Sequence, residues 1–350
     1  MRTSLSLFGL AFFFAASSSP LPASSAPSTD PYRYLRLPER VLDPVTVAET
    51  GFIRDHLRDP EFVVGWVPVT APLPGSWKAV AVELDANEVA RRGIDLGTLR
   101  FRVPASEAAR RGESYHSYES LTAELERLTG KYPTLVRRFS AGRSVEGRAL
   151  WYLRLASPSG RESGVKLLYV SSMHGDEVTG KELLVYLARD LLAGYGNDAQ
   201  ATALLDHAEI WLLPSMNPDG TEAGRRWNAR GVDLNRDFPR TSGDAFSEAG
   251  RAPETVALMR LFRDHHFQLT LNFHGGEVVV NLPWDHRSNP PGAATNFGDD
   301  ALLRELAAEY SAANAPMYAN DGGSFEHGVT YGYEWYQVLG GMQDWSNLFR

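Results

Sequence analysis

The sequence predicts an α/β fold, and three short apolar runs carry that prediction. The runs are residues 165–170, 210–213 and 269–273, and helical or loop-rich sequence separates each from the next. Short strands that alternate with helices are typical of α/β domains. Unusual polar residues follow all three runs, and in an open α/β sheet ligands bind at the carboxyl ends of the strands. We therefore expect the three following loops to converge on one site.

Length, charge and composition limit the possible classes of protein. With 350 residues, 43% of them hydrophobic, the chain can form one large core and a smaller companion domain. A formal net charge of -8 leaves no basic surplus for phosphates, so nucleic acid is not expected as a partner. The chain has no cysteine, which excludes disulfides, thiolate metal ligands and a cysteine nucleophile. Any metal site must use His, Asp or Glu.

The first residues predict export. Arg2 precedes an apolar run at residues 5–16, which small residues follow, and this is the pattern of a secretory signal peptide over residues 1–26. The run is shorter than the roughly 20 residues of a membrane-spanning helix, and no later segment qualifies as one. We expect a secreted or periplasmic protein. The alternative is an apolar tail on a cytosolic protein.

Residues 27–104 are predicted to form a small α/β module or propeptide. Strand-like runs at residues 79–84 and 99–103 flank a helix-like segment at residues 86–92. No residue of the module indicates chemistry. An inhibitory propeptide, a folding aid and an accessory domain therefore all remain open for it.

A linker is predicted at residues 105–114, because this stretch is short and polar. It contains Arg110 and Arg111, which are either a processing site or part of a linker that is never cut. The second domain is predicted over residues 115–350. It begins with a helix capped by Ser117, whose leucines recur at helical spacing over residues 121–128.

The loop after the first strand carries two residues that can bind a metal. His174 and Glu177 stand three residues apart, between the strand and a helical pattern at residues 178–192. This spacing can aim an imidazole and a carboxylate at one cation, although such a pair alone is more often a helix cap and a surface residue. His274 follows the third strand and precedes two glycines, which allow backbone to approach a bound group.

Zinc is the metal that this set of ligands predicts. Two histidines and one glutamate leave the fourth position of a catalytic zinc site for water, whereas structural zinc sites have four ligands, usually including cysteine. Magnesium and calcium prefer more oxygen ligands.

A segment rich in anion-binding groups lies between the two halves of the metal set. It contains Arg226, Asp233, Asn235 and Arg236, and arginine is the natural partner of a carboxylate. For any one of these residues a solvated charged loop is the simpler interpretation. Their order relative to the metal set favours a substrate-binding segment.

Five motifs together resemble the zinc carboxypeptidases, and within them the regulatory branch that includes carboxypeptidases M, N and E. They are His-Gly-Asp-Glu at 174–177, Asn-Pro-Asp-Gly at 217–220, Asp-Leu-Asn-Arg-Asp-Phe-Pro at 233–239, His-Gly-Gly at 274–276 and Gly-Gly-Met-Gln-Asp at 340–344. The resemblance runs from about residue 115 to residue 350. It implies a mixed, mostly parallel twisted sheet with helices on both faces, and a metallocarboxypeptidase that hydrolyses the C-terminal residue of peptides by metal-activated water.

The resemblance also implies the metal ligands and their support. His174, Glu177 and His274 would bind one Zn²⁺ per chain, and Asp233 would orient a ligand imidazole. The substrates would be peptide or protein C-termini. Side-chain preference and oligomeric state stay open.

Further roles in the substrate site follow from the same resemblance. Asn235 and Arg236 would hold the terminal carboxylate of the substrate, and Arg226 would stabilise the oxyanion. Tyr336 would close over the substrate, although a packed aromatic residue beside Trp335 is the alternative.

The general base of the family is a glutamate on a late strand, about twenty residues beyond the tyrosine. Glu326 and Glu334 precede Tyr336 and do not match that position, which falls after Arg350. We therefore expect a C-terminally incomplete catalytic domain. Turnover should be near background if the reading frame ends at Arg350, and activity is expected if it continues with a Glu in a strand-like run.

Two other functions remain open at this stage. A non-catalytic, exported carboxypeptidase-like module would hold peptide termini or a cell-wall fragment without cleaving them, and the missing glutamate favours it. A zinc amidase or deacylase of the same superfamily would keep the zinc ligands but need not keep Asn235, Arg236 and Tyr336.

Overall fold

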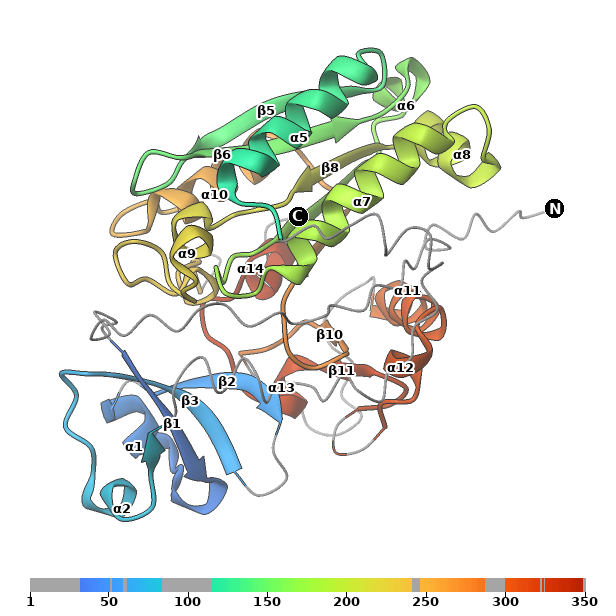
Figure 1. Ribbon diagram of the computed structural model, residues 1–350. Helices are drawn as coiled ribbons and strands as arrows, with labels where there is room; N and C mark the ends of the chain where they lie inside the picture. Colours follow the sequence, from blue (N-terminus) through green and yellow to red (C-terminus); the bar gives the residue numbers. More distant parts are fainter. Residues whose placement is uncertain are drawn as a thin grey trace. The chain divides into compact units, whose positions relative to one another are not determined.

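The computed structural model describes residues 32–50, 52–58, 62–83, 115–240, 246–286, 300–321, 323 and 325–348 (Figure 1). The chain divides into two compact units, with the boundary between residues 103 and 104. The expected signal peptide, the helix at 86–92, the strand at 99–103 and the linker with its paired arginines lie outside the described residues.

The first unit is an antiparallel sheet with strand order β2-β3-β1-β4. Its elements are β1 (Tyr32–Pro38), η1 (Glu39–Val41), α1 (Pro44–Thr50), β2 (Ile53–Arg58), β3 (Phe62–Pro68), α2 (Gly75–Lys78) and β4 (Val82–Glu83). Trp77 lies in its core and donates its ring N–H to the Val41 carbonyl at 2.9 Å. The strand expected at residues 79–84 starts only at Val82, because Val80 and Ala81 donate their N–H groups to the Trp77 carbonyl and so continue the turn of α2.

The second unit contains a mixed sheet with strand order β5-β6-β8-β7-β9. The strands are β5 (Val136–Arg143), β6 (Ala149–Leu155), β7 (Lys166–Ser171), β8 (Glu209–Leu213) and β9 (Leu269–Phe273). β5 and β6 pair antiparallel, as do β6 and β8, whereas β7 pairs parallel with both β8 and β9. The predicted mixed α/β sheet is confirmed. Its parallel part consists of the three strands that precede the polar loops.

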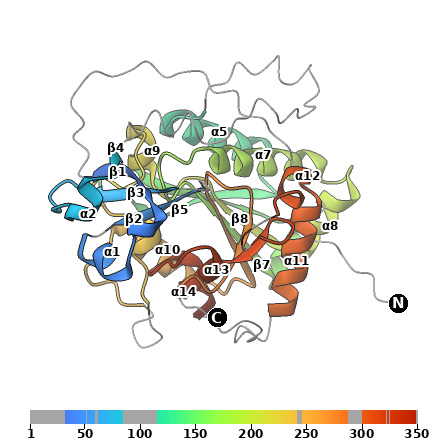
Figure 2. The ribbon, with the colours of Figure 1, turned by 90° about the horizontal axis from the view of Figure 1, so that it is seen from below.

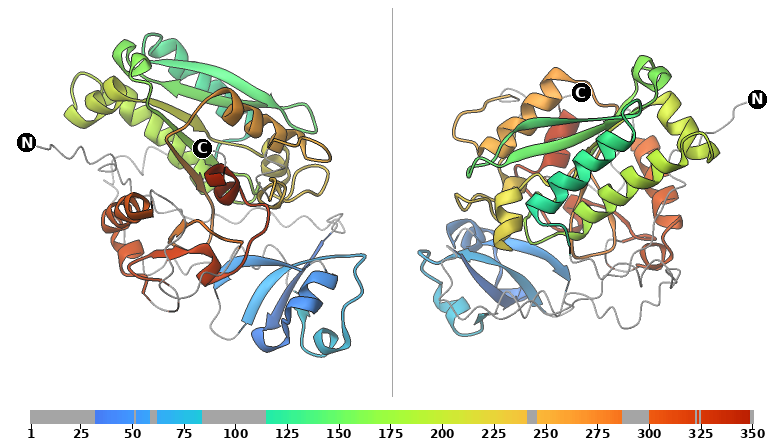
Figure 3. Two further views of the ribbon diagram at one scale, coloured as in Figure 1. Left: turned by 180° about the vertical axis from the view of Figure 1, so that it is seen from behind. Right: turned by 45° about the horizontal axis from the view of Figure 1, so that its top comes forward.

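Helices cover both faces of this sheet, as Figures 2 and 3 show. The leucines of α5 (Tyr118–Lys131) and α7 (Thr179–Gly194) pack with α8 (Ala199–His207) against one face. Residues of α10 (Pro253–Asp264) and α14 (Met342–Leu348) pack against the other. Neighbouring strand residues alternate between the two cores, for example Leu167 and Leu168, because side chains in a strand point to opposite faces.

The start of α5 shows why the sequence prediction of this helix holds. Ser117 accepts a hydrogen bond from the N–H of Ser120, which satisfies one donor that the first turn would otherwise leave unpaired. Leu121, Leu125 and Leu128 are buried on one face of the helix. The helix ends at Lys131, one residue beyond the expected end at Gly130.

The remaining elements of the second unit are short, except for the 13-residue helix α11. They are α6 (Pro158–Glu162), α9 (Pro218–Ala223), η3 (Leu234–Arg236), β10 (Val280–Leu282), α11 (Asp300–Ala312), α12 (Ala315–Tyr318), β11 (Val329–Tyr331) and α13 (Gly332–Trp335). β10 and β11 form a separate parallel pair. Among the described residues, no helix combines the length and the apolar character needed to cross a membrane.

Candidate metal centre and substrate-binding groups

The parallel strands bring three polar loops to one edge of the sheet. β7 lies between β8 and β9, so the chain leaves β7 flanked by the ends of both neighbours. His174 and Glu177 lie in the loop between β7 and α7, and His274 directly follows β9. The ends of parallel strands thus place residues that are 100 positions apart side by side.

His174, Glu177 and His274 form a compact cluster, in which one ligand atom from each lies within 4.8 Å of the other two. Nδ1 of His174 is 2.8 Å from Oε1 of Glu177, and Nδ1 of His274 is 2.8 Å from Oε2 of the same carboxylate. The two Nδ1 atoms are 3.1 Å apart. Atoms at these distances can surround one cation, and two imidazoles with one carboxylate are the donor set of a catalytic zinc site. No other such group occurs among the residues that the structure describes.

The cluster runs from the interior to the surface. His174 is buried, whereas the side chain of His274 is 27% exposed. Glu177 lies between them and accepts a hydrogen bond from the Gly275 N–H at 3.0 Å. A metal ion held here would be reached by solvent and ligands from the His274 side.

Asp233 supports His174 from the side opposite Glu177. Its Oδ1 is 3.1 Å from Nε2 of His174, which leaves Nδ1 of that imidazole facing the cluster. Burial acts to raise the pKa of Asp233, but the charges of Arg226 and His174 outweigh it and hold this pKa well below its usual range. Asp233 is therefore an anion that holds the imidazole of His174, in the arrangement that carboxylates behind zinc-bound histidines adopt.

The protonation of His174 reflects the same neighbours. Burial and the charge of Arg226 act to lower its pKa, but Glu177 and Asp233 outweigh them and raise the pKa of His174 to about 9. Only the neutral imidazole binds a metal ion. Metal and proton therefore compete for this ring across the neutral range.

Arg226 lies within the buried charge network of the cluster. Its Nε donates to Oδ2 of Asp233 at 3.0 Å, and its Nη1 is 3.7 Å from Oε1 of Glu177. The residue is only 4% exposed. The structure thus places a guanidinium directly beside the Glu177 carboxylate.

Asn235 and Arg236 are presented by the short turn η3, which Asp233 caps by accepting the Asn235 N–H at 2.9 Å. The side-chain amide of Asn235 lies 3.4 Å from Nε2 of His274 and accepts the Met342 N–H at 3.0 Å. Arg236 donates to the Asn235 carbonyl and is half-buried. The amide of Asn235 therefore lies next to the cluster, and the guanidinium of Arg236 belongs to the same short turn. Both groups can bind an anionic ligand.

Tyr336 follows α13 and packs edge-on against Trp335, with ring centroids 4.8 Å apart. Its ring is half-buried. Closure over a substrate stays a prediction for this residue.

Sequence reasoning missed an acidic pair next to the anion-binding groups. The buried carboxylate of Asp344 accepts the N–H of Asp285 at 2.9 Å and contacts His286 at 2.6 Å, and Gln343 donates to Asp285. Burial and the charge of Asp344 raise the pKa of Asp285 above its usual range, although hydrogen bonds from Gln343 and Asn281 and the charge of Arg236 act to lower it. Asp344 and Gln343 belong to a recognised motif, but no local pattern distinguishes Asp285.

Asn272 is a second residue that sequence reasoning missed. It lies in β9 two residues before His274, and its amide is 3.1 Å from Nε2 of that imidazole. Alternation along the strand was the available signal, because residues two apart share a face.

Comparisons with known proteins agree with this geometry. A model of the zinc carboxypeptidase family matches residues 121–349. Human carboxypeptidase D is 35% identical over 302 residues, which cover 80% of this chain and 21% of that protein, so the chain spans about a fifth of it. Mouse carboxypeptidase M is 35% identical over 255 residues, which cover 67% of this chain and 57% of that protein.

Solved structures show the same fold at low sequence identity. The crystal structure of carboxypeptidase A from Helicoverpa armigera superposes with a TM-score of 0.63 at 18% identity, covering 91% of this chain and 85% of that one. Thrombin activatable fibrinolysis inhibitor superposes with a TM-score of 0.60 at 19% identity, covering 90% and 86%. These two structures show the fold, and the family model that matches residues 121–349 shows that the chain belongs to the zinc carboxypeptidase family.

Proposed function

We propose that this chain binds Zn²⁺ through His174, Glu177 and His274 and acts as a carboxypeptidase on the C-termini of peptides. The observation that carries the proposal is the placement of anion-binding groups around a His-Glu-His cluster. Arg226 lies 3.7 Å from Glu177, and Asn235 lies 3.4 Å from His274. A site that combines a metal with groups for a free carboxylate suits removal of a terminal residue.

The residues of this chain would divide the work as follows. Bound zinc supplies an acidified water and polarises the scissile carbonyl. Arg226 is placed to donate a charged hydrogen bond to the developing oxyanion, while Asp233 holds both that guanidinium and the His174 ring in position. Asn235 and Arg236 would bind the terminal carboxylate. Binding and hydrolysis of the peptide are separate measurements, because a protein can bind a substrate without turning it over.

Recognition of a free carboxylate separates this proposal from the alternatives. A zinc amidase or deacylase has no need of Asn235 and Arg236 beside the metal, and both are present here. A non-catalytic binding module would keep these groups and bind the same ligands without turnover. Hydrolysis therefore distinguishes the peptidase from the binding module. Cleavage of a substrate whose C-terminus is blocked as an amide distinguishes the amidase from the peptidase.

The test compares two dipeptides that differ only at the C-terminus, one a free acid and the other an amide. We expect calorimetry on the zinc-loaded protein to show binding of the acid and loss of binding with Arg236→Gln. Arg240→Gln is the matched control, because Arg240 is an exposed cation near the same segment. Equal binding or cleavage of the amide would contradict the carboxypeptidase assignment.

Export remains part of the proposal. Arg2 and the apolar run at residues 5–16 support a cleaved signal peptide, and secretion or a periplasmic location would follow. The mass of the mature protein tests this, since cleavage near residue 26 removes a defined segment. A protein that retains Met1 after export-competent expression would contradict it.

A further inference from the structure

Asn217 lies in the loop between β8 and α9, where it caps α9, and it is fully buried. Its Oδ1 accepts the Gly220 N–H at 2.9 Å, which is the ordinary work of a helix cap. Its Nδ2 also donates two hydrogen bonds, to the carbonyl of Met173 at 3.3 Å and to the carbonyl of Arg226 at 3.2 Å. One amide thus joins the turn that carries the ligand His174 to the backbone of the arginine beside the cluster.

Two backbone hydrogen bonds join the same segments. The Gly175 N–H donates to the Arg226 carbonyl at 3.2 Å, and the Asn217 N–H donates to the Ser172 carbonyl at 3.0 Å. A Cβ added at Gly175 would overlap the backbone of Gly220. The turn that carries His174, the turn that begins at Asn217 and the backbone of Arg226 are therefore in direct contact. This leaves little space for any of the three to move independently.

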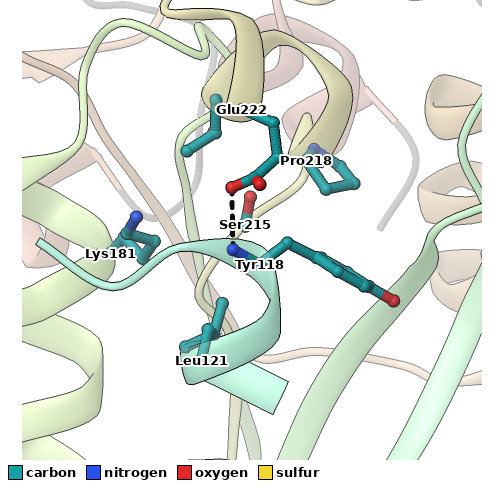
Figure 4. A pocket seen from close by; sticks show the side chains of 7 residues that line it. Tyr118, Leu121, Lys181, Ser215, Pro218 and Glu222 are labelled. Atoms are coloured by element: carbon teal, nitrogen blue, oxygen red, sulfur yellow. Dashed lines mark hydrogen bonds between the residues drawn. The ribbon is translucent and has the colours of Figure 1, made fainter.

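The cap turn is itself fixed to the scaffold. Glu222 in α9 accepts the Tyr118 N–H at 2.7 Å, which ties α9 to the first turn of α5 (Figure 4). Lys181 of α7 and Ser215 line the same small pocket as Tyr118 and Glu222. The helix that Asn217 caps is therefore hydrogen-bonded to α5.

We propose that Asn217 is a positioning residue that sets the placement of His174 relative to Arg226, so that metal affinity depends on an amide that never touches the metal. This inference rests on the proposed zinc site. Two donors are required at once, and they must reach two carbonyls from a cap position. Serine caps helices equally well but is too short and has one donor, and aspartate has none in its ionised form.

The test compares Asn217→Ser with Asn314→Ser. Asn314 caps α12 through the Met317 N–H in the same way but has no part in the metal centre, so the control reports the loss of a cap amide elsewhere. Zinc affinity is measured by competition with a chelator, at a temperature where both variants are folded. We expect Asn217→Ser to bind zinc about tenfold or more weakly, as for other residues that orient metal ligands, and Asn314→Ser to match the unaltered protein.

A spectroscopic signature separates positioning from a general loss of stability. Substitution of cobalt for zinc should give a visible absorption spectrum that Asn217→Ser changes and Asn314→Ser does not. Unaltered zinc affinity and cobalt spectrum in Asn217→Ser would overturn the inference while leaving the zinc site intact. Failure of the unaltered protein to bind zinc would instead overturn the proposed function.

Amide hydrogen exchange on the unaltered protein keeps the inference testable if Asn217→Ser does not fold. Zinc binding should slow exchange in residues 217–224 as well as in residues 173–178, because the side-chain amide of Asn217 connects the two turns. Slowing confined to residues 173–178 would overturn the inference.

Discussion

Replacing Asp233 by asparagine removes the charge at the centre of the buried network without changing its shape. Asp233 is buried, with one oxygen 3.1 Å from Nε2 of His174 and the other 3.0 Å from Nε of Arg226. Breaking a buried ion pair by removing one partner costs about 3–5 kcal/mol of unfolding free energy. Glu177 remains 3.7 Å from Arg226 and retains part of the compensation, so we expect about 3 kcal/mol.

The same substitution weakens metal binding through His174. Loss of a group that orients a ligand imidazole lowers metal affinity about 10–100-fold, which corresponds to about 1.4–2.7 kcal/mol. Urea unfolding of the metal-free protein measures the first effect, and chelator competition measures the second. Both assays are run on Asp233→Asn and on the unaltered chain.

Asp237→Asn is the matched control for this experiment. Asp237 lies four positions along the same segment, where its carboxylate accepts the Ala252 N–H at 2.8 Å. We expect Asp237→Asn to change stability by about 1 kcal/mol, the net worth of an ordinary hydrogen bond, and to leave zinc affinity unchanged. Zinc affinity that is equal in Asp233→Asn and the unaltered chain, or equally reduced in both variants, would refute the reasoning.

Three further predictions concern the protonation of His174 and one buried carboxylate. Because the pKa of His174 is raised to about 9, zinc affinity should rise up to about tenfold per pH unit from pH 7 to pH 9, and calorimetry showing no pH dependence would contradict this. The same raised pKa stabilises the metal-free fold below the unfolded pKa of about 6.5, and this contribution should be lost in urea titrations as pH rises through about 9. Glu254 is fully buried and accepts from the Val145 N–H and the Asn228 amide at 2.9 Å each, so Glu254→Ala should cost about 1–3 kcal/mol per donor left unpaired, and unchanged urea unfolding would exclude that role.

The sequence predicted the elements whose signals are local. The leucine spacing after Ser117 predicted α5, and the apolar runs predicted the three parallel strands, because buried strands and amphipathic helices leave their period in the chain. β5 was not identified, since charged residues such as Arg137 and Arg138 interrupt its apolar pattern. The order of the strands in the sheet could not be predicted either, because the hydrophobic pattern of a strand does not specify its neighbours.

Some residues of the candidate site could be predicted from the sequence, and others could not. His174 and Glu177 are three residues apart, and His274 could be added because parallel strand ends meet at one edge of a sheet. The contact between Asp285 and Asp344 joins residues 59 positions apart in irregular segments, where no period relates them. Asn217 was recognised only as part of a motif, since its bonds to two distant carbonyls depend on the packing of three loops.

The central claim is that His174, Glu177 and His274 hold one zinc ion, and metal stoichiometry combined with X-ray absorption tests it most directly. The account predicts one zinc per chain, with two imidazole nitrogens and a carboxylate oxygen as protein ligands at about 2.0–2.2 Å. Binding should be lost in His274→Ala and retained in His286→Ala, which removes an imidazole that instead contacts Asp344. Zinc binding that survives His274→Ala with an unchanged absorption spectrum would contradict the account.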